Sequence, residues 1–231
     1  MDSYFGIPIT TIPIPSGQSI KMLFNEIDSY IYCLTNTSIH VIDPSINVLI
    51  FTISLSGIAD DMVINPVNGD IYVSYNNLNI VDIFMYSTTT PIVSLSMSQI
   101  PSKMVFHDYE ESVYVVISDD TVVRISNRTI HTIHSVVGVK PIMFYEPINK
   151  SIFVYGNIFV NQIDNGVVNV TSIPSATSAD MIFNNTTGEM NISDSNNSYI
   201  IVDPNGDIVS SVNIGNGGYL GLNPYDSSVY I

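Results

Sequence analysis

The sequence predicts an all-β fold in which one four-stranded unit repeats six times along the chain. Three observations carry this prediction. A Met or Leu recurs at intervals of 38 to 42 residues, an aromatic side chain follows ten residues later in most copies, and short runs of β-branched residues and Tyr alternate with turn residues. Units of about 40 residues with four short strands each are typical of a β-propeller. We therefore expect a six-bladed propeller of four-stranded antiparallel blades, with residues 1–231 forming a single domain.

The two repeated columns define where each blade begins, and we expect starts near residues 19, 59, 101, 140, 178 and 217. Met is flexible enough to fill the space between twisted sheets, so we expect both columns to lie between neighbouring blades. The first column contains Met22, Met62, Met104, Met143, Met181 and Leu220. The second column contains Tyr32, Tyr72, Tyr114, Phe153, Asn191 and Tyr230.

The second unit displays the four strands of a blade. Runs of β-type residues span 61–64, 70–75, 79–84 and 91–97, with turn residues between them. The first two runs are joined by the sequence NPVNG at 65–69, in which Pro and Gly suit a hairpin turn. No segment carries a helical period over a useful length.

The two ends of the chain are expected to complete one blade together. After the sixth aromatic position the chain stops, with the inner strands at 219–222 and 228–231. Two β-type runs, at 3–7 and 9–14, precede the first unit, and their prolines suit an outer edge because Pro cannot donate to a ladder. We expect these N-terminal strands to close the last blade, which would remove exposed sheet edges. Alternatively, they pair with a neighbouring subunit and build a filament.

The second unit resembles the YVTN-type β-propeller repeat. The resemblance rests on the sequence NPVNGDIYVSY at 65–75, followed by NIVDI at 79–83. The chain departs from the family pattern at Asn191, where Tyr is expected, and no copy spells the four-letter signature. The resemblance implies a propeller architecture and a place among archaeal or bacterial surface and secreted proteins.

The charge composition argues against two classes of partner. The net charge is −15, with 21 acidic and 6 basic residues, and 12% of residues are charged. Nucleic acids and anionic membranes both attract Lys and Arg, so we expect neither as a partner, and no apolar run is long enough to insert in a membrane. No secretory signal is visible at 1–5. The lack of a visible signal would be explained if the chain is processed, is a domain excised from a longer protein, or is a virion component.

No catalytic motif stands out, so we expect no catalytic residue, metal or cofactor. Cys33 is the single cysteine and is expected to be a buried, inert thiol. His107 is expected in a surface loop, while His131 and His134 should face opposite sides of a strand. Propeller lyases and lactonases, which resemble this repeat, carry acidic and His ligands at the channel mouth. Here Asp60, Asp61 and Asp180 could converge, without a His.

A column of charged residues precedes the Met column. Lys21, Asp61, Lys103 and Asp180 open the innermost strands of four units, so we expect them to form a charged ring at one end of the channel. The signs alternate over the first three blades, which predicts ion pairs between Asp61 and the flanking lysines. The alternative is an anion site at Lys21 and Lys103.

Glycosylation sequons are enriched less than twofold over chance. One sequon, at Asn191, falls in the aromatic column, so we expect this residue to be buried and not glycosylated. An attached glycan would place the protein outside the cytoplasm. The other candidates are Asn36, Asn127, Asn149, Asn169, Asn184, Asn185 and Asn196.

Together these features predict a non-enzymatic structural or adhesive propeller of a cell surface, an extracellular filament or a virion. Its partners are expected to be proteins, glycans or further copies of the chain. Two alternatives stay open: a metal-dependent enzyme of the propeller lyase or lactonase kind, and an intracellular scaffold that binds proteins through its blade-top loops.

Overall fold

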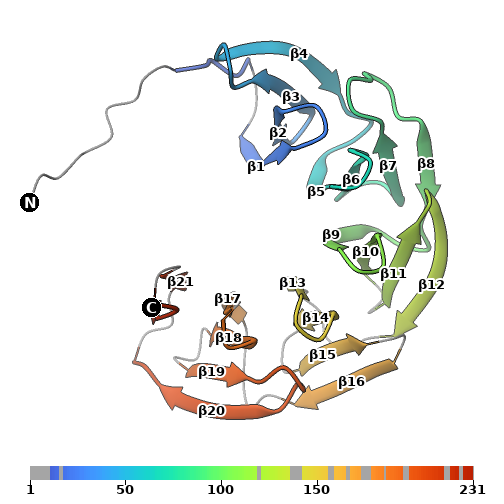
Figure 1. The fold of residues 1–231 in the computed structure, drawn as a ribbon. Coiled ribbons are helices and arrows are strands. Elements are labelled where there is room, and N and C mark those ends of the chain that lie inside the picture. Colours follow the sequence, from blue (N-terminus) through green and yellow to red (C-terminus); the bar gives the residue numbers. More distant parts are fainter. Residues whose placement is uncertain are drawn as a thin grey trace, which may run out of the picture. The chain divides into compact units, whose positions relative to one another are not determined.

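A computed structural model shows an all-β chain (Figure 1). It contains five four-stranded antiparallel sheets and one two-stranded sheet, which we number one to six along the chain, and no helix lies in the described part. None of the described residues therefore belongs to a helix that could cross a membrane. The structure describes residues 11–15, 18–118, 121–135, 142–155, 159–164, 167–172, 178–184, 186–194, 198–215, 219–223 and 226–230.

The chain divides into two compact units, which are described separately. Unit 1 is Met1–Ser96 and unit 2 is Met97–Ile231. In unit 1, the first sheet is formed by β1 (Ser19–Asn25), β2 (Tyr30–Thr35), β3 (Ser38–Asp43) and β4 (Val48–Ser54). The second sheet is formed by β5 (Ala59–Ile64), β6 (Ile71–Tyr75), β7 (Ile80–Phe84) and β8 (Val93–Ser96).

Unit 2 contains the remaining four sheets. The third is β9 (Pro101–His107), β10 (Ser112–Ile117), β11 (Thr121–Ser126) and β12 (Thr129–Ser135). The fourth is β13 (Ile142–Glu146), β14 (Ser151–Tyr155), β15 (Phe159–Asp164) and β16 (Val167–Ser172). The fifth is β17 (Ser178–Asn184), β18 (Glu189–Asp194), β19 (Ser198–Val202) and β20 (Ile208–Asn213). The sixth pairs β21 (Gly221–Leu222) with β22 (Val229–Tyr230).

Three members of the Met column, Met62, Met143 and Met181, lie between sheets of their own unit, as predicted. In unit 1, Met62 belongs to a core cluster that joins Tyr32 and Leu34 of the first sheet to Val73 of the second. In unit 2, Met143 packs against a cluster that contains Tyr114 of the third sheet. Met181 packs against a cluster that contains Phe153 of the fourth sheet. Each Met therefore contacts the face of the sheet before its own.

Met22 does not share this environment. It pairs with Cys33 on β2, whereas the adjacent Leu23 pairs with Tyr32 and packs into the core of unit 1. Because neighbouring side chains on a strand face opposite sides, Met22 lies on the face of the first sheet that points away from the second sheet. Met22 is 56% exposed there, whereas Met62 is 0% exposed.

The N-terminal strand expected over residues 9–14 is absent from its described part. Residues 11–15 are in no strand, and residues 1–10 lie outside the described residues. Pro13 and Pro15 explain this locally, because each lacks a backbone N–H and restricts the residue before it. Over the described residues the sixth sheet has two strands, and Tyr230 is exposed, unlike the buried members of its column.

Candidate functional site

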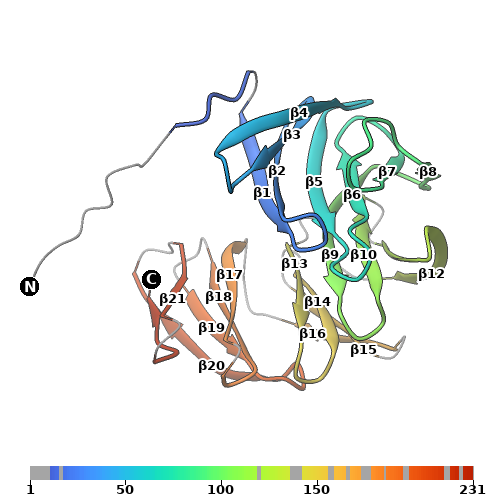
Figure 2. The ribbon, with the colours of Figure 1, turned by 45° about the horizontal axis from the view of Figure 1, so that its top comes forward.

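The loop between the first two strands has the same backbone turn in every sheet. Just before the second strand, one residue adopts a positive φ, the left-handed region that Gly reaches most easily. Figure 2 shows two of these loops, β1–β2 and β5–β6, next to each other at one end of unit 1. The left-handed residues are Ser29 (64°), Gly69 (76°), Glu111 (49°), Lys150 (60°), Gly188 (73°) and Ser227 (59°).

The side chain that opens the loop caps the loop's own backbone. Asn25 Oδ1 accepts a hydrogen bond from the N–H of Ile27 at 3.0 Å, and Asn65 Oδ1 accepts one from Val67 at 2.9 Å. Asn184 Oδ1 accepts from Thr186 at 3.0 Å. Asn is suited to this turn because its amide oxygen reaches the backbone two residues on.

The same side chain also donates a hydrogen bond to the left-handed residue of the following sheet, and we call this bond the loop clasp. It joins consecutive sheets at equivalent positions, within unit 1 and within unit 2. The described residues contain three clasps: Asn25 Nδ2 to Gly69 O at 3.4 Å, His107 Nε2 to Lys150 O at 2.8 Å, and Asn184 Nδ2 to Ser227 O at 3.0 Å.

His107 corrects the expectation of a surface histidine. The residue ends β9, is buried, and lies between the rings of Tyr114 and Tyr145, with centroid distances of 5.7 and 4.6 Å. Its Nδ1 accepts the N–H of Glu110 at 3.2 Å while Nε2 forms the clasp. One neutral imidazole with its proton on Nε2 makes both bonds, so it replaces the Asn of the other loops.

Glu146 opens the corresponding loop of the fourth sheet and breaks the pattern. Its carboxylate accepts the N–H groups of Ile148 and Asn149, at 2.5 and 2.7 Å. An ionised carboxylate accepts hydrogen bonds and cannot donate one, so Glu146 caps its own loop without the amide donor that makes the clasp.

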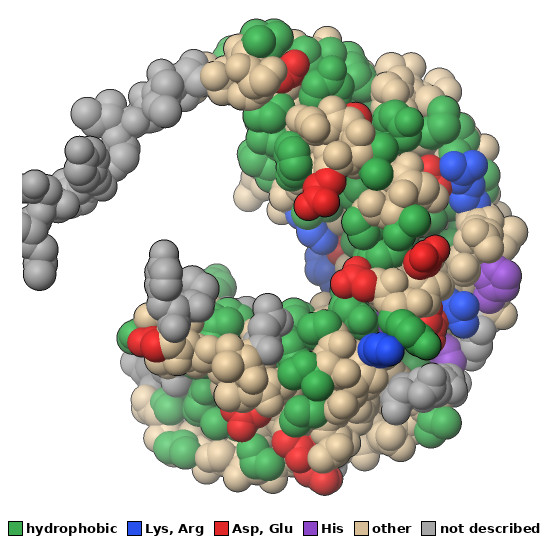
Figure 3. All heavy atoms as spheres, in the orientation of Figure 1, with side chains coloured by type: hydrophobic (Ala, Val, Ile, Leu, Met, Phe, Trp, Pro, Cys, Tyr) green, Lys and Arg blue, Asp and Glu red, His purple; other side chains and the backbone are tan. Residues whose placement is uncertain are grey.

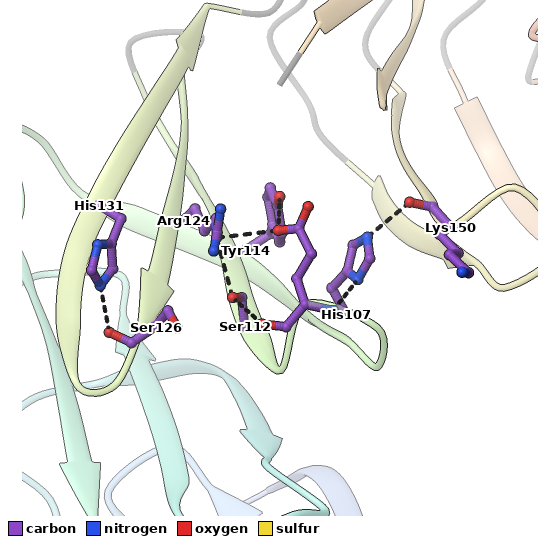
Figure 4. Close-up of polar contacts among 8 residues, drawn as sticks. His107, Ser112, Tyr114, Arg124, Ser126, His131 and Lys150 are labelled. Atoms are coloured by element: carbon purple, nitrogen blue, oxygen red, sulfur yellow. Dashed lines mark hydrogen bonds and ion pairs between the residues drawn. The ribbon is translucent and has the colours of Figure 1, made fainter. Parts of the chain in front are cut away.

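A second polar network lies beside the His107 clasp (Figure 4). Glu110 Oε2 accepts the Tyr114 hydroxyl at 2.8 Å and pairs with Arg124 Nε at 3.2 Å. Burial raises the pKa of Tyr114, and its hydrogen bond to Glu110 adds to this effect. The pKa of His134, which stacks on Tyr114 at 6.3 Å, is lowered by burial. His131 is exposed and contacts Ser126 O, whereas His134 is buried.

Two members of the predicted charged ring lie together. Lys21 Nζ contacts Asp61 Oδ1 at 2.8 Å, and the Asp61 side chain is 7% exposed against 33% for Lys21. The same Asp61 oxygen accepts the N–H of Met62, which fixes the carboxylate on its strand. Lys103 lies on β9 in unit 2, and the side chain of Asp180 lies outside the described part. The complete ring stays a prediction.

A buried carboxylate in the second sheet was not predicted. Asp82 accepts the Tyr75 hydroxyl at 2.7 Å and the Ser56 hydroxyl at 3.0 Å, and Ser94 donates to its other oxygen. Burial raises the pKa of Tyr75, and the Asp82 hydrogen bond raises it further. The position of Asp82 between Val81 and Ile83, in an apolar strand, was the available sequence signal. Three hydroxyl donors offset the cost of removing this carboxylate from water.

The candidate sequons divide by exposure. Asn36, Asn127, Asn149 and Asn169 are exposed. Asn184 is buried and its amide makes the clasp, which removes it from the accessible candidates. Asn191 is buried as predicted and accepts the Tyr199 hydroxyl. The remaining candidates, Asn185 and Asn196, lie outside the described residues.

The described residues contain no group of three or more His, Cys, Asp or Glu side chains placed to hold a metal ion. Asp60 and Asp61 are adjacent on β5. No family model matches the chain, and no curated protein matches it either. The resemblance to YVTN-type repeats therefore stays a prediction.

Proposed function

We propose that the chain closes into a six-bladed β-propeller that serves as a non-enzymatic structural or adhesive module of a cell surface, an extracellular filament or a virion. The observation that carries this proposal is the loop that recurs in all six sheets. In three of these loops a described side chain makes a clasp to the following sheet. A hydrogen bond that joins a sheet to the following sheet, always in the same direction along the chain, is suited to a closed ring.

The outward face of the first sheet supports closure. Met22 and Phe24 are 56% and 53% exposed, whereas their equivalents Met62 and Ile64 belong to or pack against the core of unit 1. Full burial of a Met or Phe side chain contributes about 1.5–3 kcal/mol, so covering the exposed half of each would contribute about half of that. In a ring, the sixth sheet would cover this face in the way that the first sheet covers Met62.

The clasp column specifies the contacts of such a ring. Asn223 opens the sixth loop, and the left-handed residue that would follow it in a ring is Ser29. The segment 3–14 would supply the outer strands of the sixth blade, or pair with a neighbouring copy.

The surface chemistry supports a place outside the cytoplasm. With 12% charged residues, the chain relies on uncharged polar groups for hydration, and the face drawn in Figure 3 carries few charged side chains among many uncharged ones. Four sequon asparagines are exposed. Such a surface suits protein or glycan partners, and the resemblance to YVTN-type surface proteins agrees with it. An uncharged polar surface also keeps its hydration when carboxylates become protonated.

Mass spectrometry of the native protein, with metal analysis of the same sample, tests this proposal. We expect hexose-bearing peptides at one or more of Asn36, Asn127, Asn149 and Asn169, and no stoichiometric divalent metal. An unmodified mass together with one bound divalent metal per chain would overturn the proposal in favour of the metal-dependent enzyme. An unmodified mass without metal would favour the intracellular scaffold.

A further inference from the structure

A row of three soft donor groups crosses the first sheet. Met22 on β1 pairs with Cys33 on β2, and Cys33 pairs with His40 on β3. Directly paired residues of antiparallel strands project from the same face, with Cβ atoms about 4.5–5.5 Å apart. A thioether, a thiol and an imidazole therefore lie next to one another on a single rigid element.

The imidazole of His40 has a hydrogen-bond partner at one ring nitrogen and none at the other. Its Nδ1 lies 3.0 Å from the Thr52 hydroxyl on β4, the next strand of the row. His40 is 1% exposed, and its Nε2 has no hydrogen-bond partner in the described structure. Leaving a buried polar atom unpaired costs about 1–3 kcal/mol. Because Nδ1 is turned toward β4, Nε2 occupies the opposite edge of the ring, on the side of β2 and Cys33.

The thiol of Cys33 is buried on that side. Cys33 is the one cysteine of the chain, so it forms no disulfide within the chain, and its Sγ lies 3.5 Å from the Ser19 hydroxyl. The buried nitrogen of His40 and the buried thiol are thus neighbours on one face, with the flexible Met22 side chain beside them. The buried, unpartnered nitrogen points to a ligand in this row.

We propose that Met22, Cys33 and His40 form a binding site for a soft monovalent metal ion, Cu(I). Thiolate and thioether ligands select Cu(I), and imidazole suits copper as well. On binding, the metal would replace the thiol proton of Cys33, which passes to solvent. The Nδ1–H of His40 would donate to Thr52, which leaves the Nε2 lone pair free for the metal.

Zn²⁺ fits this row less well. Structural zinc sites hold four Cys, His or carboxylate ligands, and the described residues contain no group of three such side chains placed for a metal. Cu(I) accepts fewer ligands and a thioether among them. All three proposed ligands belong to one sheet, so this inference is independent of ring closure and of the proposed function.

Competition for Cu(I) against a chromogenic Cu(I) chelator, under anaerobic reducing conditions, tests the site. We expect one ion per chain and an X-ray absorption spectrum with both sulfur and nitrogen ligands. Cys33→Ala should abolish stoichiometric binding, and His40→Gln should weaken it at least about tenfold. Met22→Leu should weaken it less, since a thioether is the weakest of the three donors.

The controls are an exposed His and an exposed Met outside the row. His131→Gln and Met85→Leu should leave Cu(I) affinity unchanged. Absence of stoichiometric Cu(I) binding by the unaltered chain would overturn the proposal, as would equal affinity in the Cys33→Ala variant. If Cys33→Ala fails to fold, the Met22→Leu variant provides the test, because that substitution conserves side-chain volume. Unchanged affinity and sulfur ligation in that variant would then reject the three-residue site.

Discussion

The clasp makes one substitution especially informative, because Asn→Asp removes the donor and keeps the acceptor. In Asn184→Asp, Oδ1 still accepts the N–H of Thr186, as it does now at 3.0 Å. The group that donated to Ser227 O becomes a carboxylate oxygen facing a carbonyl oxygen. The variant therefore isolates the bond between consecutive sheets from the capping of the loop.

The expected loss is set by burial. Asn184 is 4% exposed, so the substitution leaves a buried side-chain oxygen without a hydrogen-bond donor, which costs about 1–3 kcal/mol. We expect Asn184→Asp to lower the free energy of unfolding by this amount at neutral pH. Asn25→Asp should lower it less, because its clasp is longer, at 3.4 Å. In acid, a protonated Asp can donate again, so the difference from the unaltered chain should shrink.

Urea-induced unfolding followed by circular dichroism measures the effect. Asn213→Asp is the matched control, because exposed Asn213 caps its own turn by accepting the N–H of Gly215 at 3.0 Å. The control should stay within about 0.5 kcal/mol of the unaltered chain. If Asn184→Asp proves no more destabilising than Asn213→Asp, the clasp is not a stabilising contact and our reasoning is refuted.

Three further predictions concern ionisable groups. The pKa of Tyr114 is raised in the folded state, so the contribution of Tyr114 to stability is present below about pH 10 and is lost as the pH rises above that value. Tyrosinate absorbance of the unaltered chain, compared with that of Tyr114→Phe, should show that the Tyr114 ring ionises only on alkaline unfolding. The pKa of His134 is lowered in the folded state, so the stability should fall as the pH drops below about 6.5. His134→Gln should therefore reduce the dependence of the unfolding midpoint on pH below about 6.5, and an unchanged dependence would contradict this prediction. A double-mutant cycle of Lys21→Met and Asp61→Asn should give a coupling free energy of about 0.2–1 kcal/mol at neutral pH. Zero coupling would show that the ion pair is not a stabilising contact.

The spacing of the sequence repeat predicted where the first strand begins in four of the six sheets. The first strands of four sheets begin at Ser19, Ala59, Pro101 and Ser178, where the Met column placed them. The second strand of a sheet is buried on both faces, as in β6 and β10, so a position in the second column predicted burial. Asn191 illustrates this, because its position in the column predicted burial despite its polarity.

Other features depended on contacts that sequence spacing does not encode. His107 appeared to be a surface residue because its clasp acceptor, the Lys150 carbonyl, is a backbone atom 43 residues away. The sequon at Asn184 was expected at a turn, but Asn184 is buried and its amide makes a clasp to Ser227 O. The three hydroxyl groups that donate to Asp82 come from separate segments, so the sequence around Asp82 does not predict that its carboxylate is hydrogen-bonded. Tertiary hydrogen bonds override local expectation at each of these positions.

Methionine oxidation followed by peptide mass spectrometry tests closure of the ring most directly. The chain provides its own standards, since Met62 is 0% exposed and Met85 is 42% exposed. Oxidation requires access to the thioether, so its rate at each Met reports whether another part of the molecule covers it. If the sixth sheet covers the first, Met22 will oxidise as slowly as Met62. Oxidation of Met22 as fast as Met85, in folded monomeric protein, would contradict the closed propeller.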